Sequence, residues 1–410
     1  MQALQILEDG NGLRLDDPPP IVPSPDPNEV VLRYRLEASD LPMGEQRIHC
    51  RFAAPGADAH PLELAALRTE RSGELSAAAL FFLDRYVLKH VSLQGFAPPA
   101  GPLAYLLQQL ANAVAPAAIY ALLATGYALI YGITGRLNLA FGDFTTVGAF
   151  AAVNGLVLAG LTSLAVLPAS ASLGLAFATA TGAALGFVLH ALVFAPLQRR
   201  SSQALLIATI GLAIVTSEGL RLLGRSRQIW LPPFLEQPLD ILPTDVTVSL
   251  GQTVLALLAA LTVGGVLVLL RRTAFGRCYR ACADDVEAAA LVGVDTDRTL
   301  RLACVLGSAV AGVAGFVVAM RYGIVTFGMG TTWGFKALAA AIIGGIGSVS
   351  GAALGGVLVG LLEGLWAGYL PGVYREIALF ALLALMLAIR PHGLFGAPTA
   401  AENPMLWRSG

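Results

Sequence analysis

Ionisable residues interrupt long apolar runs of this 410-residue chain, among them Asp143, Glu218, Lys336 and Glu363. A charged side chain is costly inside a membrane and usually faces protein or water, so these residues are candidates for a polar pathway. Glu218 and Lys336 stand near the ends of their runs, where we favour a structural role with the side chain extending to the membrane surface. Asp143 follows a glycine-containing stretch and either lines a pathway or caps the next helix.

Catalytic and metal chemistry are not indicated by the remaining polar residues. No nucleophile, base and orienting group occur together, and the cysteines lack the spacing of a metal site. The histidines are scattered over unrelated segments: His49, His60, His90, His190 and His392. No nucleotide-binding GKS/T follows the glycines at 344–351, so any ATP must be hydrolysed on another chain. We expect no enzyme activity, no cofactor or metal on this chain, and no nucleic-acid partner.

Composition places most of the chain in a membrane, since 56% of its residues are hydrophobic, 13% are charged and 45 are glycine. A spanning helix needs about 20 apolar residues. Such runs occupy residues 104–133, 140–160, 171–197, 204–223, 251–270, 302–320, 334–368 and 373–390. The run 334–368 is too long for one span, and its glycines predict a short helix, a break and a second helix. We predict an all-α polytopic membrane protein of about eight to nine transmembrane helices, one of them interrupted.

The first hundred residues differ from the rest and predict a small N-terminal α+β extramembrane module, followed by a membrane domain (101–396) and a C-terminal tail (397–410). Residues 1–100 carry 9 Lys and Arg against 14 Asp and Glu, whereas residues 101–410 carry 17 against 13. Alternating residues at 31–36 and 47–52 predict two half-buried strands after a proline-rich connector, 18–27. A one-sided apolar pattern at 75–93 predicts a helix that packs on the module or lies on a membrane.

A charged, helix-forming insert at 273–298 separates two of the apolar runs and resembles a segment built for contact. Six arginines flank or enter it: Arg271, Arg272, Arg277, Arg280, Arg298 and Arg301. This excess of cations predicts that the insert is cytoplasmic. Asp284 and Asp285 favour the start of a helix there, and Gly293 favours its end.

The sidedness of the module stays open at this level. Counting single crossings back from a cytoplasmic insert places residues 1–100 outside, yet residues 1–9 lack an export signal, which favours the inside. An extra crossing within 101–133, broken at Pro116, would reconcile the two, and we lean towards a cytoplasmic module.

From Gln108 to Phe395 the chain resembles the permease subunit of bacterial branched-chain (hydrophobic) amino acid ABC importers. Three blocks carry the resemblance: YALLATGYALIYGITGRLNLAFGD at 120–143, GRCYRACADDVEAAALVGVDTDR at 276–298 and KALAAAIIGGIGSVSG at 336–351. They occur in the family's order and cover most of the membrane part, whereas residues 1–100 lie outside the match. One departure is Phe141, because these permeases commonly have histidine there.

The resemblance implies a multi-pass inner-membrane protein that moves a small zwitterionic solute, foremost a branched-chain or hydrophobic amino acid, by alternating access. Implied partners are a second homologous permease, two ABC ATPase subunits that bind ATP and magnesium, an extracytoplasmic solute-binding protein and membrane lipid. The implied ATPase-coupling residues are Arg280, Asp284, Glu287, Ala288, Ala289 and Gly293. The implied pathway residues are Asn138, Phe141, Gly142 and Asp143.

Three alternatives remain at this level. A permease for urea or short amides would share the same blocks. A self-sufficient secondary transporter should carry a chain of buried carboxylates or histidines able to relay protons, and the sequence offers few. A membrane receptor would need a sensor motif in residues 1–100, where none is recognised.

Overall fold

The computed structural model describes residues 21–22, 29–35, 45–52, 64–69, 73–74, 102–158, 167–197, 202–223, 229–231, 238–240, 247–345, 347–370, 374–390 and 393–395. The chain forms two compact units, Met1–Pro98 and Pro99–Gly410.

The first unit contains a five-stranded antiparallel sheet in which each strand pairs with the next along the chain. Its strands are β1 (Ile21–Val22), β2 (Glu29–Arg35), β3 (Glu45–Phe52), β4 (Leu64–Thr69) and β5 (Gly73–Glu74). Both predicted strands are present, as β2 and β3, which are hydrogen-bonded neighbours. The stretch expected to be a connector contains β1, and the helix expected at 75–93 lies outside the described residues.

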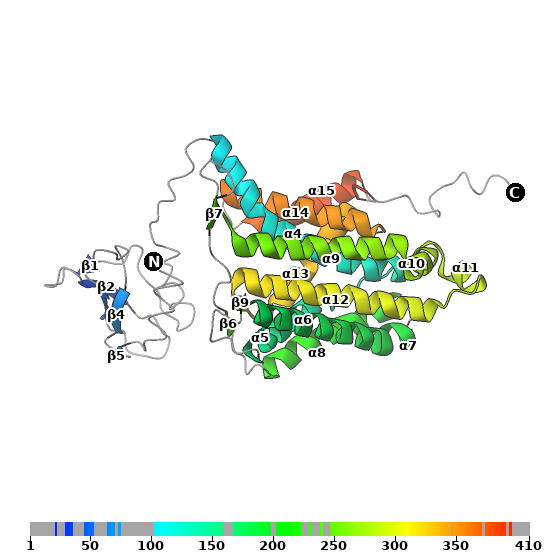
Figure 1. Ribbon diagram of the computed structural model, residues 1–410, viewed down its shortest axis with the longest axis horizontal. Helices are drawn as coiled ribbons and strands as arrows, with labels where there is room; N and C mark the ends of the chain where they lie inside the picture. Colours follow the sequence, from blue (N-terminus) through cyan, green and yellow to red (C-terminus); the bar gives the residue numbers. More distant parts are fainter. Residues whose placement is uncertain are drawn as a thin grey trace. The chain divides into compact units, whose positions relative to one another are not determined.

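The second unit is a helical bundle (Figure 1), which confirms the predicted all-α polytopic class. Seven helical stretches of the described residues are long and apolar enough to span a membrane: Tyr105–Thr134, Phe141–Leu158, Ser170–Leu197, Gln203–Leu223, Leu250–Arg272, Thr296–Tyr322 and Val349–Tyr369. They lie in α4 (Pro102–Thr134), α5 (Phe141–Leu158), α6 (Leu167–Leu189) continued by η3 (His190–Phe194) and α7 (Ala195–Leu197), α8 (Ser202–Leu223), α9 (Leu250–Arg272), α12 (Thr296–Tyr322) and α14 (Val349–Tyr369). Two shorter apolar helices, α13 (Met329–Gly344) and α15 (Arg375–Ile389), complete the bundle.

The long apolar run near the C-terminus is interrupted as predicted. Helix α13 ends at Gly344, and Gly345 has a φ of 109°, a conformation that glycine tolerates and other residues avoid. Ser348 then caps α14, because its side chain accepts a hydrogen bond from Gly351 N at 3.1 Å.

The prediction that an extra membrane crossing lies within residues 101–133 was wrong. Helix α4 is continuous from Pro102 to Thr134 and contains Pro116 in its interior. A proline can sit inside a spanning helix when neighbouring helices satisfy the freed backbone, so an apolar run with a proline need not divide. Residues 102–134 therefore cross the membrane once.

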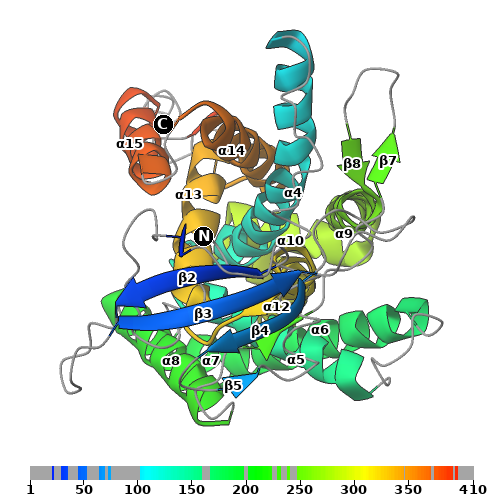
Figure 2. The same ribbon diagram turned by 90° about the vertical axis from the view of Figure 1, so that its left-hand side faces the viewer.

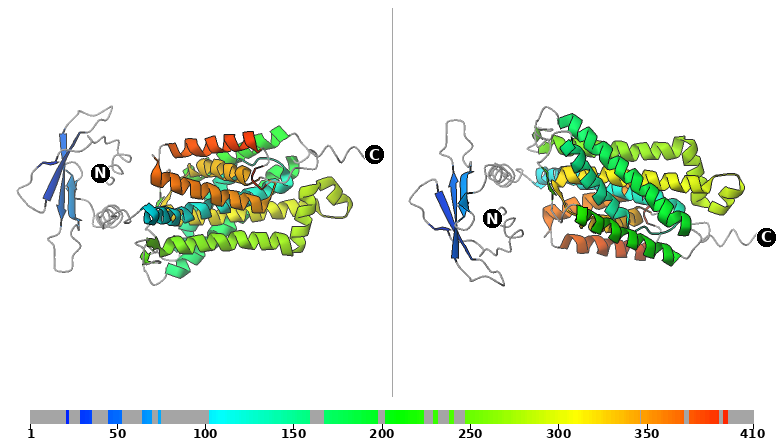
Figure 3. Two further views of the ribbon diagram at one scale, coloured as in Figure 1. Left: turned by 90° about the horizontal axis from the view of Figure 1, so that it is seen from above. Right: turned by 90° about the horizontal axis from the view of Figure 1, so that it is seen from below.

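The two ends of the bundle are built differently, as Figure 1 shows. At one end α9 leads into α10 (Ala274–Asp284) and α11 (Val286–Leu291). At the other end short strands pair: β6 (Ile229–Trp230) with β9 (Ile324–Val325), and β7 (Pro238–Asp240) with β8 (Thr247–Ser249). Figure 3 shows the yellow-green α11 projecting beyond the neighbouring helices from both sides.

Glycines bring α4 and α14 into backbone contact. A Cβ atom added to Gly356, Gly360 or Gly364 would lie 2.4, 2.2 or 2.3 Å from atoms of Tyr120, Ala117 or Ala113. Small residues at four-residue intervals are the usual way for membrane helices to approach closely. This contact places Tyr120 of α4 against the face of α14.

Candidate functional site

Two hydrogen bonds of Asn138 hold the chain just before α5. Asn138 Oδ1 accepts a hydrogen bond from Ala140 N at 3.1 Å, and Asn138 N donates to the Tyr127 hydroxyl at 3.2 Å. Asn138 is 3% exposed, so it lies inside the protein. Asn138 therefore closes a turn just before α5, whereas Asp143 lies inside the first turn of the helix and not at its N-cap position.

Buried polar atoms without partners gather at this helix start. Asp143 lies in the first turn of α5 and is 4% exposed. Among the described residues, Asn138 Nδ2, Asp143 Oδ1, Thr145 Oγ1 and Thr146 Oγ1 have no hydrogen-bond partner. Leaving such a group unsatisfied costs about 1–3 kcal/mol, more when it is charged. These atoms are chemically suited to bind a polar solute.

Glycines bring α13 directly over these groups. A Cβ atom added to Gly330 would lie 2.6 Å from both Asp143 Oδ1 and Thr146 Oγ1. A Cβ atom added to Gly142 would lie 1.9 Å from Gly330 O. Gly142 thus serves the close approach of α5 to α13, and any larger residue would separate the two helices.

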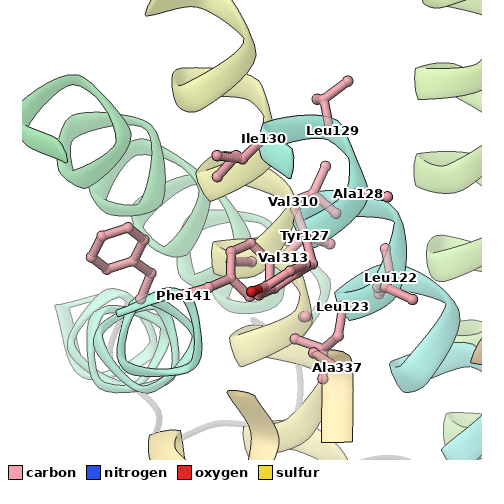
Figure 4. Packing of buried hydrophobic residues seen from close by; sticks show 14 of the residues in the cluster. Leu122, Leu123, Tyr127, Ala128, Leu129, Ile130, Phe141, Val310, Val313 and Ala337 are labelled. Carbon is pink, nitrogen blue, oxygen red and sulfur yellow. The ribbon is translucent and has the colours of Figure 1, made fainter. Parts of the chain in front are cut away.

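Phe141 belongs to the packed core. It is 1% exposed, and its ring meets the ring of Tyr127 edge-on with centroids 5.4 Å apart. Figure 4 shows this packing beside Val310 and Val313 of α12. The residue that departs from the family pattern therefore does not face an open pathway in this conformation. Of the four predicted pathway residues, Asn138 and Asp143 present polar atoms, whereas Phe141 and Gly142 pack.

The charged insert forms two short helices, each with a clear start. The Thr273 side chain caps α10 by accepting from Gly276 N at 3.2 Å. Asp285 caps α11 by accepting from Glu287 N at 2.8 Å and Ala288 N at 3.0 Å. Gly293 ends the segment with a φ of 89°. The predicted helix start is confirmed at Asp285 and the predicted stop at Gly293, whereas Asp284 is the last residue of α10.

An apolar surface, the coupling tip, is exposed on this segment. It consists of Val286, Leu291 and Val292, which are 42%, 90% and 79% exposed. Sequence reasoning missed these residues, although apolar side chains on an otherwise charged insert were the available signal. Asp284, Glu287, Ala288 and Gly293 are also exposed.

Ala289 does not lie as a partner contact requires, whereas Arg280 is exposed and also contacts its own chain. Ala289 is 3% exposed and packs within its own chain, so its small side chain cannot be explained by the approach of another protein. The guanidinium of Arg280 donates to Leu270 O near the end of α9. A cation at the carbonyl end of a helix is stabilising, so Arg280 fixes how α10 leaves α9.

Tyr279 joins this segment to the start of α5. It lies on α10, is 5% exposed, and its hydroxyl donates to Leu129 O of α4 at 3.1 Å. Burial raises the pKa of Tyr279, so the hydroxyl keeps the proton that it donates. Tyr127, two residues before Leu129, holds both Asn138 and Phe141. A continuous set of contacts therefore links α10 to the polar groups of α5.

A second polar cluster, the charge cluster, lies between α13, α14 and α15. Lys336 Nζ lies 3.4 Å from Glu363 Oε1 and 3.5 Å from Glu376 Oε1, and Arg375 Nε lies 3.1 Å from Glu363 Oε1. The Tyr120 hydroxyl of α4 donates to Glu363 Oε2. Lys336 is 5% exposed, so the expectation that it reaches the membrane surface was wrong. Its carboxylate partners make burial tolerable.

The other ionisable groups near membrane depth play local roles. Glu218 pairs with Arg221 at 2.6 Å on the exposed side of α8, as the structural reading expected. Such a surface pair contributes little. His190, in the π-helix η3 (His190–Phe194), lies 3.2 Å from Asp297 Oδ1 at the start of α12. Sequence spacing could not have paired residues so far apart.

An apolar bundle with a projecting charged segment and buried polar groups defines a polytopic membrane permease. The sequence model of the family described as "Branched-chain amino acid transport system / permease component" matches residues 109–389. The high-affinity branched-chain amino acid transport system permease protein LivH of Escherichia coli (strain K12) is 32% identical over 300 residues, 72% of this chain and 96% of that protein. BraD of Pseudomonas aeruginosa, a permease protein of the same description, is 32% identical over 297 residues, 72% of this chain and 97% of that protein.

The chain therefore belongs to the branched-chain amino acid transport permease family, and it is a transport subunit with multiple membrane-spanning helices. A shorter match, of 39% identity over 145 residues, joins it to the autoinducer 2 import system permease protein LsrC of Klebsiella pneumoniae, covering 35% of this chain and 39% of that protein. No solved structure matches the chain significantly.

Proposed function

We propose that this chain is the permease subunit of an ATP-binding-cassette importer in the bacterial inner membrane, and that it carries a branched-chain or similar hydrophobic amino acid. The observation that carries the proposal is the physical link between the exposed coupling tip and the buried polar groups of α5, through Tyr279, Leu129 and Tyr127. When ATP is hydrolysed on a separate subunit, the permease needs a physical link between the surface that meets this subunit and the groups that bind the solute.

The remaining subunits are inferred from the missing nucleotide-binding motif and from the apolar surfaces that this chain exposes. ATP with magnesium binds to two separate ATPase subunits, which meet the coupling tip in the cytoplasm. A second permease packs on the apolar helices that this chain leaves uncovered: α8 is exposed along most of its length, including Ile207, Val215 and Leu222 at 67%, 69% and 71%. Lipid covers the rest, and an extracytoplasmic solute-binding protein delivers the amino acid.

Reconstitution of the complex tests this function. In vesicles, the permease pair with its ATPases and binding protein should accumulate leucine when ATP is supplied, and this chain alone should neither hydrolyse ATP nor accumulate leucine. Urea and acetamide serve as competing solutes, because an amide permease would prefer them. Accumulation by this chain alone under a proton gradient would refute the importer and favour a secondary transporter.

Asp143 is the residue on which we expect solute contact to depend most. Asp143→Asn removes the charge that an amino acid's ammonium group would meet, and a hydrogen bond to a charged group contributes about 1.5–3 kcal/mol. Uptake per assembled complex should fall by about 10- to 100-fold. Glu218→Gln, a comparable loss of one carboxylate at an exposed pair, is the control, and its uptake per assembled complex should be unchanged. Normal uptake by Asp143→Asn would show that this carboxylate only supports folding.

A further inference from the structure

The first helix of the bundle begins at the end opposite the coupling segment, which is the charged insert at residues 273–298. Near its start, Ala111 O of α4 accepts a hydrogen bond from Gln252 Nε2, and Gln252 lies in the first turn of α9. Helix α9 ends at Arg272, where the coupling segment begins. Near the other end of α4, Leu129 O accepts from Tyr279 of α10. Helices α4 and α9 therefore run in the same direction, from the end that carries β7 and β8 to the coupling end.

A contact with α14 places the start of α4 independently. The Tyr105 hydroxyl donates to Gly368 O at 2.5 Å, so the start of α4 lies beside the end of α14. At the other end of α14, Leu394 N and Phe395 N donate to Ile343 O and Gly344 O at 2.9 and 3.0 Å. Phe395, after the last helix, therefore lies towards the end opposite Tyr105.

The chain cannot change sides before α4. Helix α4 has 33 residues, about 50 Å at 1.5 Å per residue, which exceeds a hydrocarbon core of about 30 Å. The first unit ends at Pro98, and the three residues before Pro102 reach at most about 11 Å. Within residues 1–98 charged residues recur throughout, including Asp84, Arg85 and Lys89 in the most apolar stretch, so a span of about 20 apolar residues is absent from that sequence.

We propose that residues 1–98 form an extracytoplasmic domain of the permease, on the side from which solute is delivered. The helix directions alone indicate that the module and the coupling segment lie on opposite sides of the membrane. The proposed function indicates which side is outside, since the coupling segment must meet a cytoplasmic ATPase. The proposal differs from the cytoplasmic location that the sequence had favoured. Long hydrophilic domains are translocated largely regardless of their charge, so the 14 acidic residues are no obstacle.

A site-specific protease added to spheroplasts tests the proposal on the full chain. One variant carries the cleavage sequence between Pro98 and Pro99, and its matched control carries it in the tail after Phe395. We expect cleavage of the first in intact spheroplasts and of the second only after permeabilisation. A cytoplasmic marker protein with the same cleavage sequence reports that the spheroplasts are sealed.

The other outcomes separate the two ideas. Protection of both sites in sealed spheroplasts would overturn the extracytoplasmic location and leave the importer intact. Cleavage of only the tail site would mean that the module is cytoplasmic and that the coupling end of the bundle faces outward. This result would overturn the proposed function together with the location. Cleavage of both sites would overturn the helix directions on which the inference rests.

Discussion

The Leu291→Asp permease should reach the membrane at its normal level and lose its ATPase subunits on purification. Leu291 is 90% exposed, so its replacement disturbs little within its own chain. In a docked complex, however, an aspartate there would be buried without a partner, and burying such an unpaired polar group costs about 2 kcal/mol or more. Retention of ATPase and uptake should therefore fall by at least about tenfold. Both are measured on the same purified preparation.

Two further variants distinguish docking from folding. Leu291→Met keeps an apolar tip and should retain the ATPase. Ala289→Arg places a long charged side chain where the chain is packed, so it should lower the amount of folded permease instead of releasing its partner. Full ATPase retention by Leu291→Asp would show that the coupling tip does not contact another subunit.

Loss of Glu363 should be the most destabilising single change in the charge cluster. Glu363→Leu leaves Lys336 with one half-exposed carboxylate, Glu376, and it removes both the ion-pair partner of Arg375 and the acceptor of the Tyr120 hydroxyl. Breaking a buried pair in this way costs about 3–5 kcal/mol. Thermal unfolding in detergent and the amount of permease in the membrane should both report the loss.

The double variant Lys336→Met, Glu363→Leu gives the sharper result. If the pair is structural, an apolar replacement of both partners should recover part of the stability, because Lys336 no longer needs a partner while Arg375 and the Tyr120 hydroxyl still lack theirs. A double variant that remains as unstable as Glu363→Leu would contradict this reading. Uptake by the folded double variant then reports whether the charges also serve transport.

Spans and helix starts could be predicted because their signals are local. Apolar length fixed the spans, the glycines before Ser348 predicted the break, and Asp285 and Gly293 bounded α11. Each signal depends on residues within one or two turns, so no knowledge of neighbouring helices was required.

Orientation could not be predicted, because it depends on residues far away in the sequence. Lys336 was expected at the membrane surface, but Glu363, 27 residues later, and Tyr120, on another helix, complete the charge cluster. In the same way, Phe141 packs on Tyr127, and Ala289 turns inward. The residue pattern of one helix does not show which of its faces the neighbouring helices will cover.

The glycine contact of α4 and α14 limits how the protein can change shape. With Gly360 against the backbone of Ala117, the two helices touch backbone to backbone, and this leaves little room for one to slide over the other. The pair therefore behaves as one stiff rod. Tyr279 holds the rod near one end, and Tyr105 and Gly368 close it at the other. We therefore expect any displacement of α10 to move α4 and α14 together.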